Sequence, residues 1–148
     1  MDKAVNKEQA EFLAEKTKGA LSEMPWLVGL QTNLLNLGGV AAVLWNGSNE
    51  EEFVNILLEN GREYSTANIE LHEGGRNECH ENSEQLAMTK EDYHLATGYT
   101  LSTGVWRPHS WVYDVKNKII LETTLARERY FGIDYKPNSI PTTKLEKL

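Results

Sequence analysis

The spacing of apolar residues changes near residue 90 from a helical period to alternation, and this change constrains the fold more than any other feature. Three consecutive segments beyond this point alternate apolar and polar residues: Tyr93–Ser102, Val105–Val115 and Ile119–Thr124. Turn-like residues separate them, namely Thr103-Gly104 and Lys116-Asn117-Lys118. The pattern predicts three consecutive antiparallel strands. Because helical segments come first, it also predicts an α+β architecture.

The first part of the chain, about residues 1–90, is predicted to be mainly helical. Apolar residues recur at helical steps from Lys3 to Met24, and Pro25 ends that pattern. A second helix is predicted to follow Ser48, whose spacing to Glu51 fits a capping box, and to end at Asn60-Gly61. The other predicted segments are a short strand over Asn68–His72, a short helix over Asn77–Met88, and a short helix, a strand or both within Trp26–Asn46.

We therefore expect a single domain over residues 1–148, with two or three helices packed on one side of a small antiparallel sheet. The sheet is expected over about residues 93–124, with three to five strands in total. A loosely held tail is expected over about residues 133–148, which include Pro137 and Pro141.

Composition and charge exclude several classes of function. The formal net charge of −7 argues against nucleic-acid binding, because neutralising phosphates requires clustered Lys and Arg. The longest apolar-leaning stretch, Leu34–Trp45, is too short to span a bilayer. A single cysteine excludes an internal disulfide, and residues 1–8 carry no export signal, so we expect a cytoplasmic location.

That single cysteine, Cys79, lies at the start of the predicted short helix. The first turn of a helix presents unpaired backbone N–H groups and a partial positive charge. Both favour a thiolate, which is the nucleophilic form of cysteine. The alternative for Cys79 is a buried, unreactive structural cysteine.

Two further residues complete one mechanistic layout. His109 lies within a predicted strand, where its imidazole could take a proton from a thiol. Glu122 lies on the next predicted strand, among apolar and β-branched residues where an acid needs a partner. A two- or four-residue turn between these strands would put both side chains on one face, and Glu122 could then orient His109. A three-residue turn would put them on opposite faces.

The order of these residues resembles that of the papain-like and transglutaminase-like thiol enzymes. In those families a helix-start cysteine faces a sheet that carries the histidine and then an Asp, Asn or Glu. The run His109-Ser110-Trp111 followed by Glu122-Thr123-Thr124 is similar to the transglutaminase-type pattern, with Glu122 in place of Asp and Thr123 in place of Pro. The chain also resembles a group of uncharacterised bacterial and phage proteins over about residues 75–132. The resembling elements are Cys79-His80-Glu81-Asn82, Gly98-Tyr99-Thr100-Leu101-Ser102, Trp106-Arg107-Pro108-His109-Ser110-Trp111, and Glu122-Thr123-Thr124 with Arg129-Tyr130-Phe131-Gly132.

Other residues are candidates for supporting roles. An oxyanion needs two hydrogen-bond donors. The first candidate is the Cys79 backbone N–H, and the second is the side chain of Asn77 or of Gln31. If Asn77 is the N-cap of the helix, its side chain is already used by the helix backbone. Asn82 is one turn beyond Cys79, and supports the site or faces solvent. Arg107 and Trp106 are candidates for a substrate-facing rim, with core packing as the alternative for Trp106. His72, Cys79, His80 and His109 match no compact zinc signature, so no metal or other cofactor is expected.

Two functions from different classes follow. The first is a cysteine-dependent hydrolase or acyl-transferase that acts on an amide or thioester through Cys79, His109 and Glu122, with a peptide or small molecule as substrate. The second is a non-catalytic papain-like module that binds a protein or a small molecule in the same cleft. A Cys79 sulfur near a His109 nitrogen beside an open cleft would favour the first.

Overall fold

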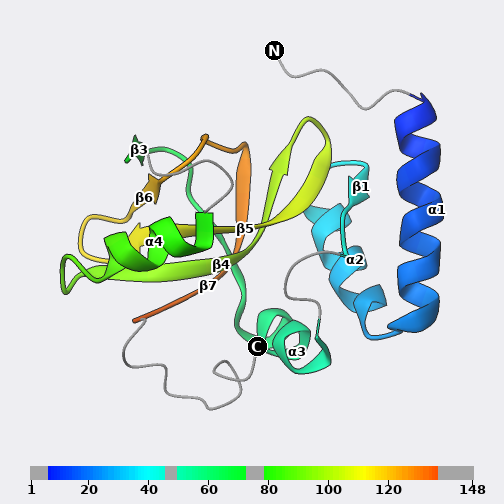
Figure 1. The fold of residues 1–148 in the computed structure, drawn as a ribbon, viewed down its shortest axis with the longest axis horizontal. Helices are drawn as coiled ribbons and strands as arrows, with labels where there is room; N and C mark the ends of the chain where they lie inside the picture. Colours follow the sequence, from blue (N-terminus) through cyan, green and yellow to red (C-terminus); the bar gives the residue numbers. More distant parts are fainter. Residues whose placement is uncertain (1–6, 46–49, 73–78, 137–148) are drawn as a thin grey trace.

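The computed structural model describes residues 7–45, 50–72 and 79–136, which form a mixed α+β structure (Figure 1). The described helices are α1 (Lys7–Glu23), α2 (Leu27–Leu37), α3 (Glu51–Asn60) and α4 (Cys79–Ala87). The described strands are β1 (Ala41–Ala42), β2 (Arg62–Tyr64), β3 (Ile69–Leu71), β4 (Tyr93–Ser102), β5 (Val105–Asp114), β6 (Ile119–Glu122) and β7 (Arg129–Tyr135). They form one sheet in the order β2-β7-β4-β5-β6-β3, with β1 beside β5.

The predicted hairpin of β4 and β5 is confirmed and forms the centre of the sheet. Ser102 pairs with Val105, and the two residues between them, Thr103 and Gly104, have φ angles of 52° and 84°. Positive φ at both central positions defines the type I′ turn, whose twist matches that of antiparallel strands. Glycine adopts this conformation without strain, so the sequence encodes the turn locally.

The turn between β5 and β6 sets which residues share a face. Asp114 pairs with Ile119, so four residues, 115–118, form the connection. The Asp114 carboxylate accepts hydrogen bonds from the backbone N–H groups of Lys116 and Asn117, at 3.0 and 3.1 Å, and holds this turn. The β5 strand therefore ends one residue earlier than predicted, and Glu122 lies on the same face as His109, Trp111 and Tyr113.

Within the described residues the sheet is larger than predicted, with seven strands rather than three to five, and it is not wholly antiparallel, because β1 pairs with β5 and β3 with β6 in parallel. The expected tail over 133–148 is wrong at its start, because Ile133, Asp134 and Tyr135 belong to β7, which pairs with both β2 and β4. Residues 137–148 lie outside the described residues, as do residues 3–6 of the first predicted helix. The predicted capping box of Ser48 and Glu51 is wrong, because α3 begins at Glu51 and its N-cap is Glu50. The segment 26–46 contains both a helix, α2, and a strand, β1.

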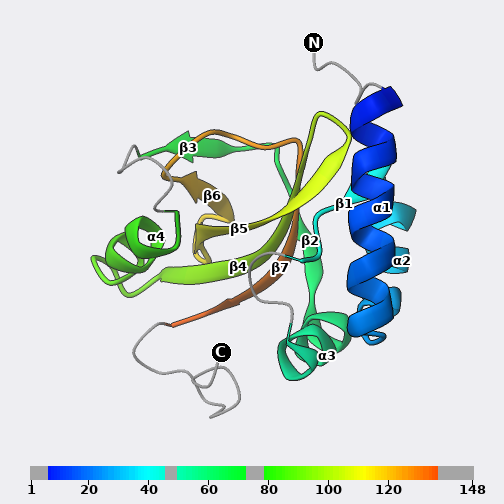
Figure 2. The same cartoon turned by 45° about the vertical axis from the view of Figure 1, so that its right-hand side comes forward.

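The helices cover one face of the sheet at two separate places (Figures 1 and 2). Helices α2 and α3 pack on one part, where their leucines meet Tyr99, Trp106 and Phe131. Helix α4 packs on another part, where Ala87 meets Leu95, Val112 and Leu121. Between these two contacts the sheet surface is free to form a cavity.

The opposite face of the sheet is rich in aromatic residues. Tyr64, Trp111 and Tyr130 come from β2, β5 and β7, and each is at most 2 % exposed. Their rings contact edge to face, with centroids 5.5 and 5.0 Å apart. Because strands supply this whole cluster, its burial results from the curl of the sheet around it. Among the described residues, no helix is both long and apolar enough to cross a membrane.

Candidate active site

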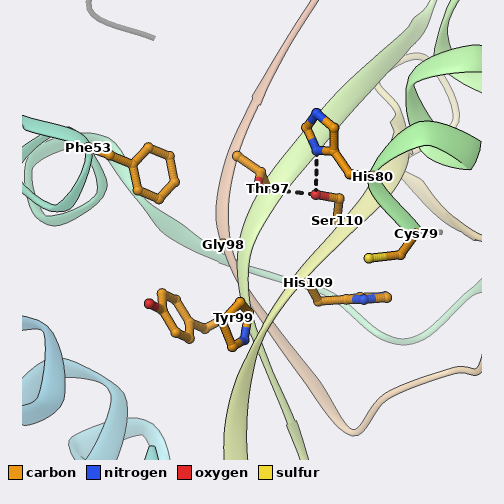
Figure 3. Close-up of a pocket in the computed structure, with 9 residues that line it drawn as sticks. Phe53, Cys79, His80, Thr97, Gly98, Tyr99, His109 and Ser110 are labelled. Atoms are coloured by element: carbon orange, nitrogen blue, oxygen red, sulfur yellow. Dashed lines mark hydrogen bonds between the residues drawn. The ribbon is translucent and has the colours of Figure 1, made fainter. Parts of the chain in front are cut away.

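The site begins at a gap along one edge of β5. On the edge away from β4, β1 pairs with Val105 and Trp106, and β6 pairs only with Val112–Asp114. Among the described residues, no strand pairs with 107–111 on that edge. Helix α4 begins there, and the Cys79 thiol lies beside His109 (Figure 3), where the His109 side chain and the Ser110 backbone interact with it. The gap therefore brings the start of a helix onto the strand that carries the histidine.

His109 connects Cys79 to Glu122. Its Nε2 lies 2.9 and 3.0 Å from the two carboxylate oxygens of Glu122, and its side chain is 4 % exposed. Because a carboxylate only accepts hydrogen bonds, Nε2 carries the proton that is donated to Glu122. Since Nε2 is taken by Glu122, Nδ1 is the ring nitrogen that remains for the Cys79 thiol beside it. In the neutral tautomer, Nδ1 directs a lone pair at the sulfur. In the charged imidazolium, Nδ1 directs an N–H at the sulfur instead.

Glu122 is completely buried, and several donors compensate for its burial. The Tyr130 hydroxyl donates to Oε1 at 2.7 Å, and the backbone N–H and hydroxyl of Thr124 donate to Oε2 at 3.1 and 2.9 Å. The Arg127 N–H donates to the Tyr130 hydroxyl at 3.0 Å, which leaves the phenolic proton directed at Glu122. A buried carboxylate held by four donors remains charged and fixed in position.

These contacts shift the pKa values of all three residues so that the charged form of each is favoured. Burial disfavours the charged form of each group, but the hydrogen bonds and opposite charges outweigh it. As a result, His109 and the Ser110 backbone lower the pKa of Cys79, while Cys79 and Glu122 raise the pKa of His109. The pKa of Glu122 is lowered by His109, Tyr130 and Thr124. All three shifts favour a thiolate beside an imidazolium, with a carboxylate behind it.

The thiol opens on a cavity of about 230 Å³ in the space between α3 and α4. Figure 3 shows the Cys79 sulfur directed into this space, with His109 beside it and Phe53 of α3 on the far side. The remaining lining residues come from the start of α4 and from the centre of the β4–β5 hairpin: His80, Thr97, Gly98, Tyr99, Pro108 and Ser110. A small molecule or one side chain of a peptide fits such a space.

The other sequence candidates lie in different places. Trp106 does not form a rim: it is fully buried in the core, where its Nε1 donates to the Gly38 carbonyl at 2.9 Å. The rim prediction fails because Trp106 and His109 differ in strand parity and so face opposite sides of the sheet. Arg107 is exposed, and neither it nor Gln31 of α2 lines the cavity. Asn82 is half-buried on α4, and Asn77 lies outside the described residues.

Two features of the site were not predicted. Tyr130 supports Glu122 from β7, a strand that the alternating pattern did not reveal. His80 and Ser110 are hydrogen-bonded beside Cys79 with their atoms 3.0 Å apart, and their positions next to Cys79 and His109 in the sequence were the available signal. Among the described residues, no group of three His, Cys, Asp or Glu side chains is placed to hold a metal ion.

Compared with known proteins, the chain matches no family model, no curated protein and no solved structure. What can be inferred about the site therefore depends on its own geometry.

Proposed function

We propose that the protein is a cysteine-dependent hydrolase or acyl-transferase that acts on an amide or thioester. The observation that carries this proposal is the alignment of three side chains beside a cavity: the Cys79 sulfur lies next to His109 (Figure 3), and His109 is hydrogen-bonded to Glu122. Nucleophile, base and orienting acid in this order are the arrangement that thiol acyl transfer requires. A structural cysteine needs neither the histidine nor the open space.

The reaction divides the work among the three residues. The Cys79 thiolate attacks the carbonyl carbon, forming a C–S bond while the carbonyl oxygen gains negative charge. The tetrahedral intermediate then expels the amine or thiol, which takes its proton from the His109 imidazolium. Water or an amine next attacks the thioester, with His109 as base, and Cys79 leaves as thiolate. Glu122 keeps the imidazole in position throughout and stabilises its charged form.

The Cys79 backbone N–H supports the first step. It belongs to the first turn of α4, where N–H groups have no acceptor within the helix. The helix dipole adds positive potential at the same end. Both would stabilise the oxyanion that forms beside the sulfur.

The proposed fold family is papain-like or transglutaminase-like. The support is the order of the parts: a cysteine that begins a helix, a histidine on the strand beside it, and an acid on the adjacent antiparallel strand. A thiolate of this kind needs a reducing compartment, so the proposal includes a cytoplasmic location.

The decisive experiment measures the rate of Cys79 alkylation by iodoacetamide as a function of pH. We expect the wild-type protein to react below pH 7 and the His109→Ala variant to react only as its thiol ionises, near the ordinary cysteine pKa of about 8.5. His94→Ala is the matched control, because His94 also pairs with a partly buried carboxylate, Asp134, at 2.8 Å but does not line the cavity.

Identical pH profiles for all three proteins would contradict the proposal. A Cys79 that does not react at all would do the same. Either outcome would favour the non-catalytic binding module, and a search for a protein or small-molecule partner would follow.

A further inference from the structure

The cavity beside Cys79 changes in polarity along its length. His80 and Ser110 lie close to the cysteine, and Figure 3 shows their hydrogen bond above the sulfur. The far side is formed by the rings of Phe53 and Tyr99, which are 2 % and 1 % exposed in the protein. A ligand that fills the cavity therefore meets hydrogen-bonding groups near the reacting sulfur and two aromatic rings further away.

The polar side is a continuous chain of three side chains. His80 Nδ1 lies 3.0 Å from Ser110 Oγ, and Ser110 Oγ lies 3.2 Å from Thr97 Oγ1. Each hydroxyl has one donor and two acceptor sites, so this chain does not use the full capacity of Ser110 and Thr97. An amide in the ligand has both a donor and an acceptor to offer them.

The volume of the cavity limits the size of the ligand. About 230 Å³ is below the roughly 300–1,000 Å³ of sites that enclose drug-sized molecules. The space suits one group of the size of a large amino-acid side chain. A long acyl chain or several adjacent residues would extend beyond it.

We infer that the acyl group transferred to Cys79 is that of an N-acylated apolar amino-acid residue. Its side chain would lie against Phe53 and Tyr99, and its amide against the His80–Ser110–Thr97 chain. This inference rests on the proposed function, and it adds the class of acyl substrate. An amino-acid residue has the same order of parts as the cavity: polar backbone next to the reacting carbonyl and hydrocarbon beyond it.

The test compares three thioesters of the same small thiol that differ only in the acyl group: acetyl, 3-phenylpropionyl and N-acetylphenylalanyl. The readout is the rate constant for acylation of Cys79, followed by thiol release and intact mass. We expect 3-phenylpropionyl to exceed acetyl by at least tenfold, because each buried methylene is worth about fourfold. N-acetylphenylalanyl should exceed 3-phenylpropionyl by a further factor of about three to ten, which corresponds to one additional net hydrogen bond.

Two variants test the size of the cavity and its polar chain. Thr97→Leu fills the space and also removes the Thr97 hydroxyl from the polar chain, so it should bring both rate ratios close to one. His80→Ala breaks the polar chain and should bring the ratio of N-acetylphenylalanyl to 3-phenylpropionyl rates close to one. The matched controls are Thr32→Leu on α2 and His72→Ala, both at residues outside the cavity, and they should leave both ratios unchanged.

The outcomes distinguish this inference from the proposed function. Acylation of Cys79 at similar rates by all three thioesters would overturn the inference and leave the proposed function standing. Unchanged ratios in both cavity variants would overturn it in the same way. A thiol that no thioester acylates, with the alkylation profile of a free cysteine, would remove the proposed function and this inference together.

Discussion

Replacing Glu122 with glutamine tests whether the buried carboxylate controls the reactivity of Cys79. The substitution keeps the size of the side chain but removes the charge that faces His109 at 2.9 Å. A hydrogen bond to a charged group is worth about 1.5–3 kcal/mol and one between neutral groups about 0.5–1.5 kcal/mol, so the imidazolium loses about 1–1.5 kcal/mol. That loss corresponds to about one pKa unit.

We therefore expect the pKa of His109 to fall by about one unit in Glu122→Gln, and the thiolate–imidazolium pair to become about tenfold less populated. The repulsion that Glu122 exerts on the thiolate acts in the opposite direction, but it is the weakest of the effects on Cys79. The amide group of glutamine also faces donors that need an acceptor. The free energy of unfolding should accordingly decrease by about 1–3 kcal/mol.

Two measurements check this prediction: the pH profile of Cys79 alkylation and urea unfolding. The alkylation rate at pH 6 should fall by about tenfold. The control is Glu70→Gln, because Glu70 also lies beside a histidine, His72, at 3.3 Å but is exposed and away from the cavity. A Glu122→Gln variant that folds stably and keeps the wild-type alkylation profile would refute the argument that Glu122 supports the imidazolium.

Three further predictions concern stability. Because the pKa of Glu122 is lowered in the folded protein, its stabilising contribution is present above its ordinary value of 4.5 and is lost on acidification. The difference in unfolding free energy between wild type and Glu122→Gln should therefore shrink between pH 7 and about pH 3. A constant difference in urea titrations would contradict this. Asp134→Asn weakens contacts with Tyr64, Arg62 and His94, and should lower the free energy of unfolding by about 1–3 kcal/mol while leaving the alkylation profile of Cys79 unchanged. Gly132→Ala would place a Cβ 2.3 Å from the Thr97 carbonyl oxygen, and should cost about 1–3 kcal/mol in the same urea assay; in the comparison variant Gly19→Ala on α1, no atom lies within 4 Å of the new Cβ, and the helix should gain about 0.5–1 kcal/mol instead.

The sequence was sufficient to predict those parts of the fold that depend on local signals. The β4–β5 hairpin follows from alternation and from a turn whose second residue is glycine. The end of α3 follows from Asn60-Gly61, where the Gly61 N–H donates to the Leu57 carbonyl at 2.7 Å. The common face of His109 and Glu122 depends on whether the turn has three or four residues. In the structure the side chain of Asp114 decides this, because it accepts from two N–H groups of the turn.

Strand β7 shows why the rest of the sheet was missed. Its residues do not alternate, because Tyr130, Phe131 and Ile133 are all buried, and Gly132 lies among them opposite Gly98 of β4. A Cβ at Gly132 would lie 2.9 Å from the Trp111 ring as well as close to Thr97, so the strand needs a residue without a side chain at this point. The glycine that this close approach requires also weakens the pattern of apolar residues by which a strand is recognised in a sequence. Glycine within a strand often marks such an approach of two backbones, but only the paired strand reveals it.

The meeting of Cys79 with His109 is a property of the sheet order rather than of any local motif. Strands β1 and β6 come from distant parts of the chain, yet both pair with the same edge of β5 and leave its centre open. Had β6 continued its pairing past Val112, the Ser110 backbone would have been used in the sheet, and α4 could not begin there. The short β6 strand and the buried Glu122 at its end are therefore connected: Thr124 turns back to donate two hydrogen bonds to Glu122 instead of extending the ladder. The residue that orients His109 thus also helps to end the strand that would otherwise exclude Cys79.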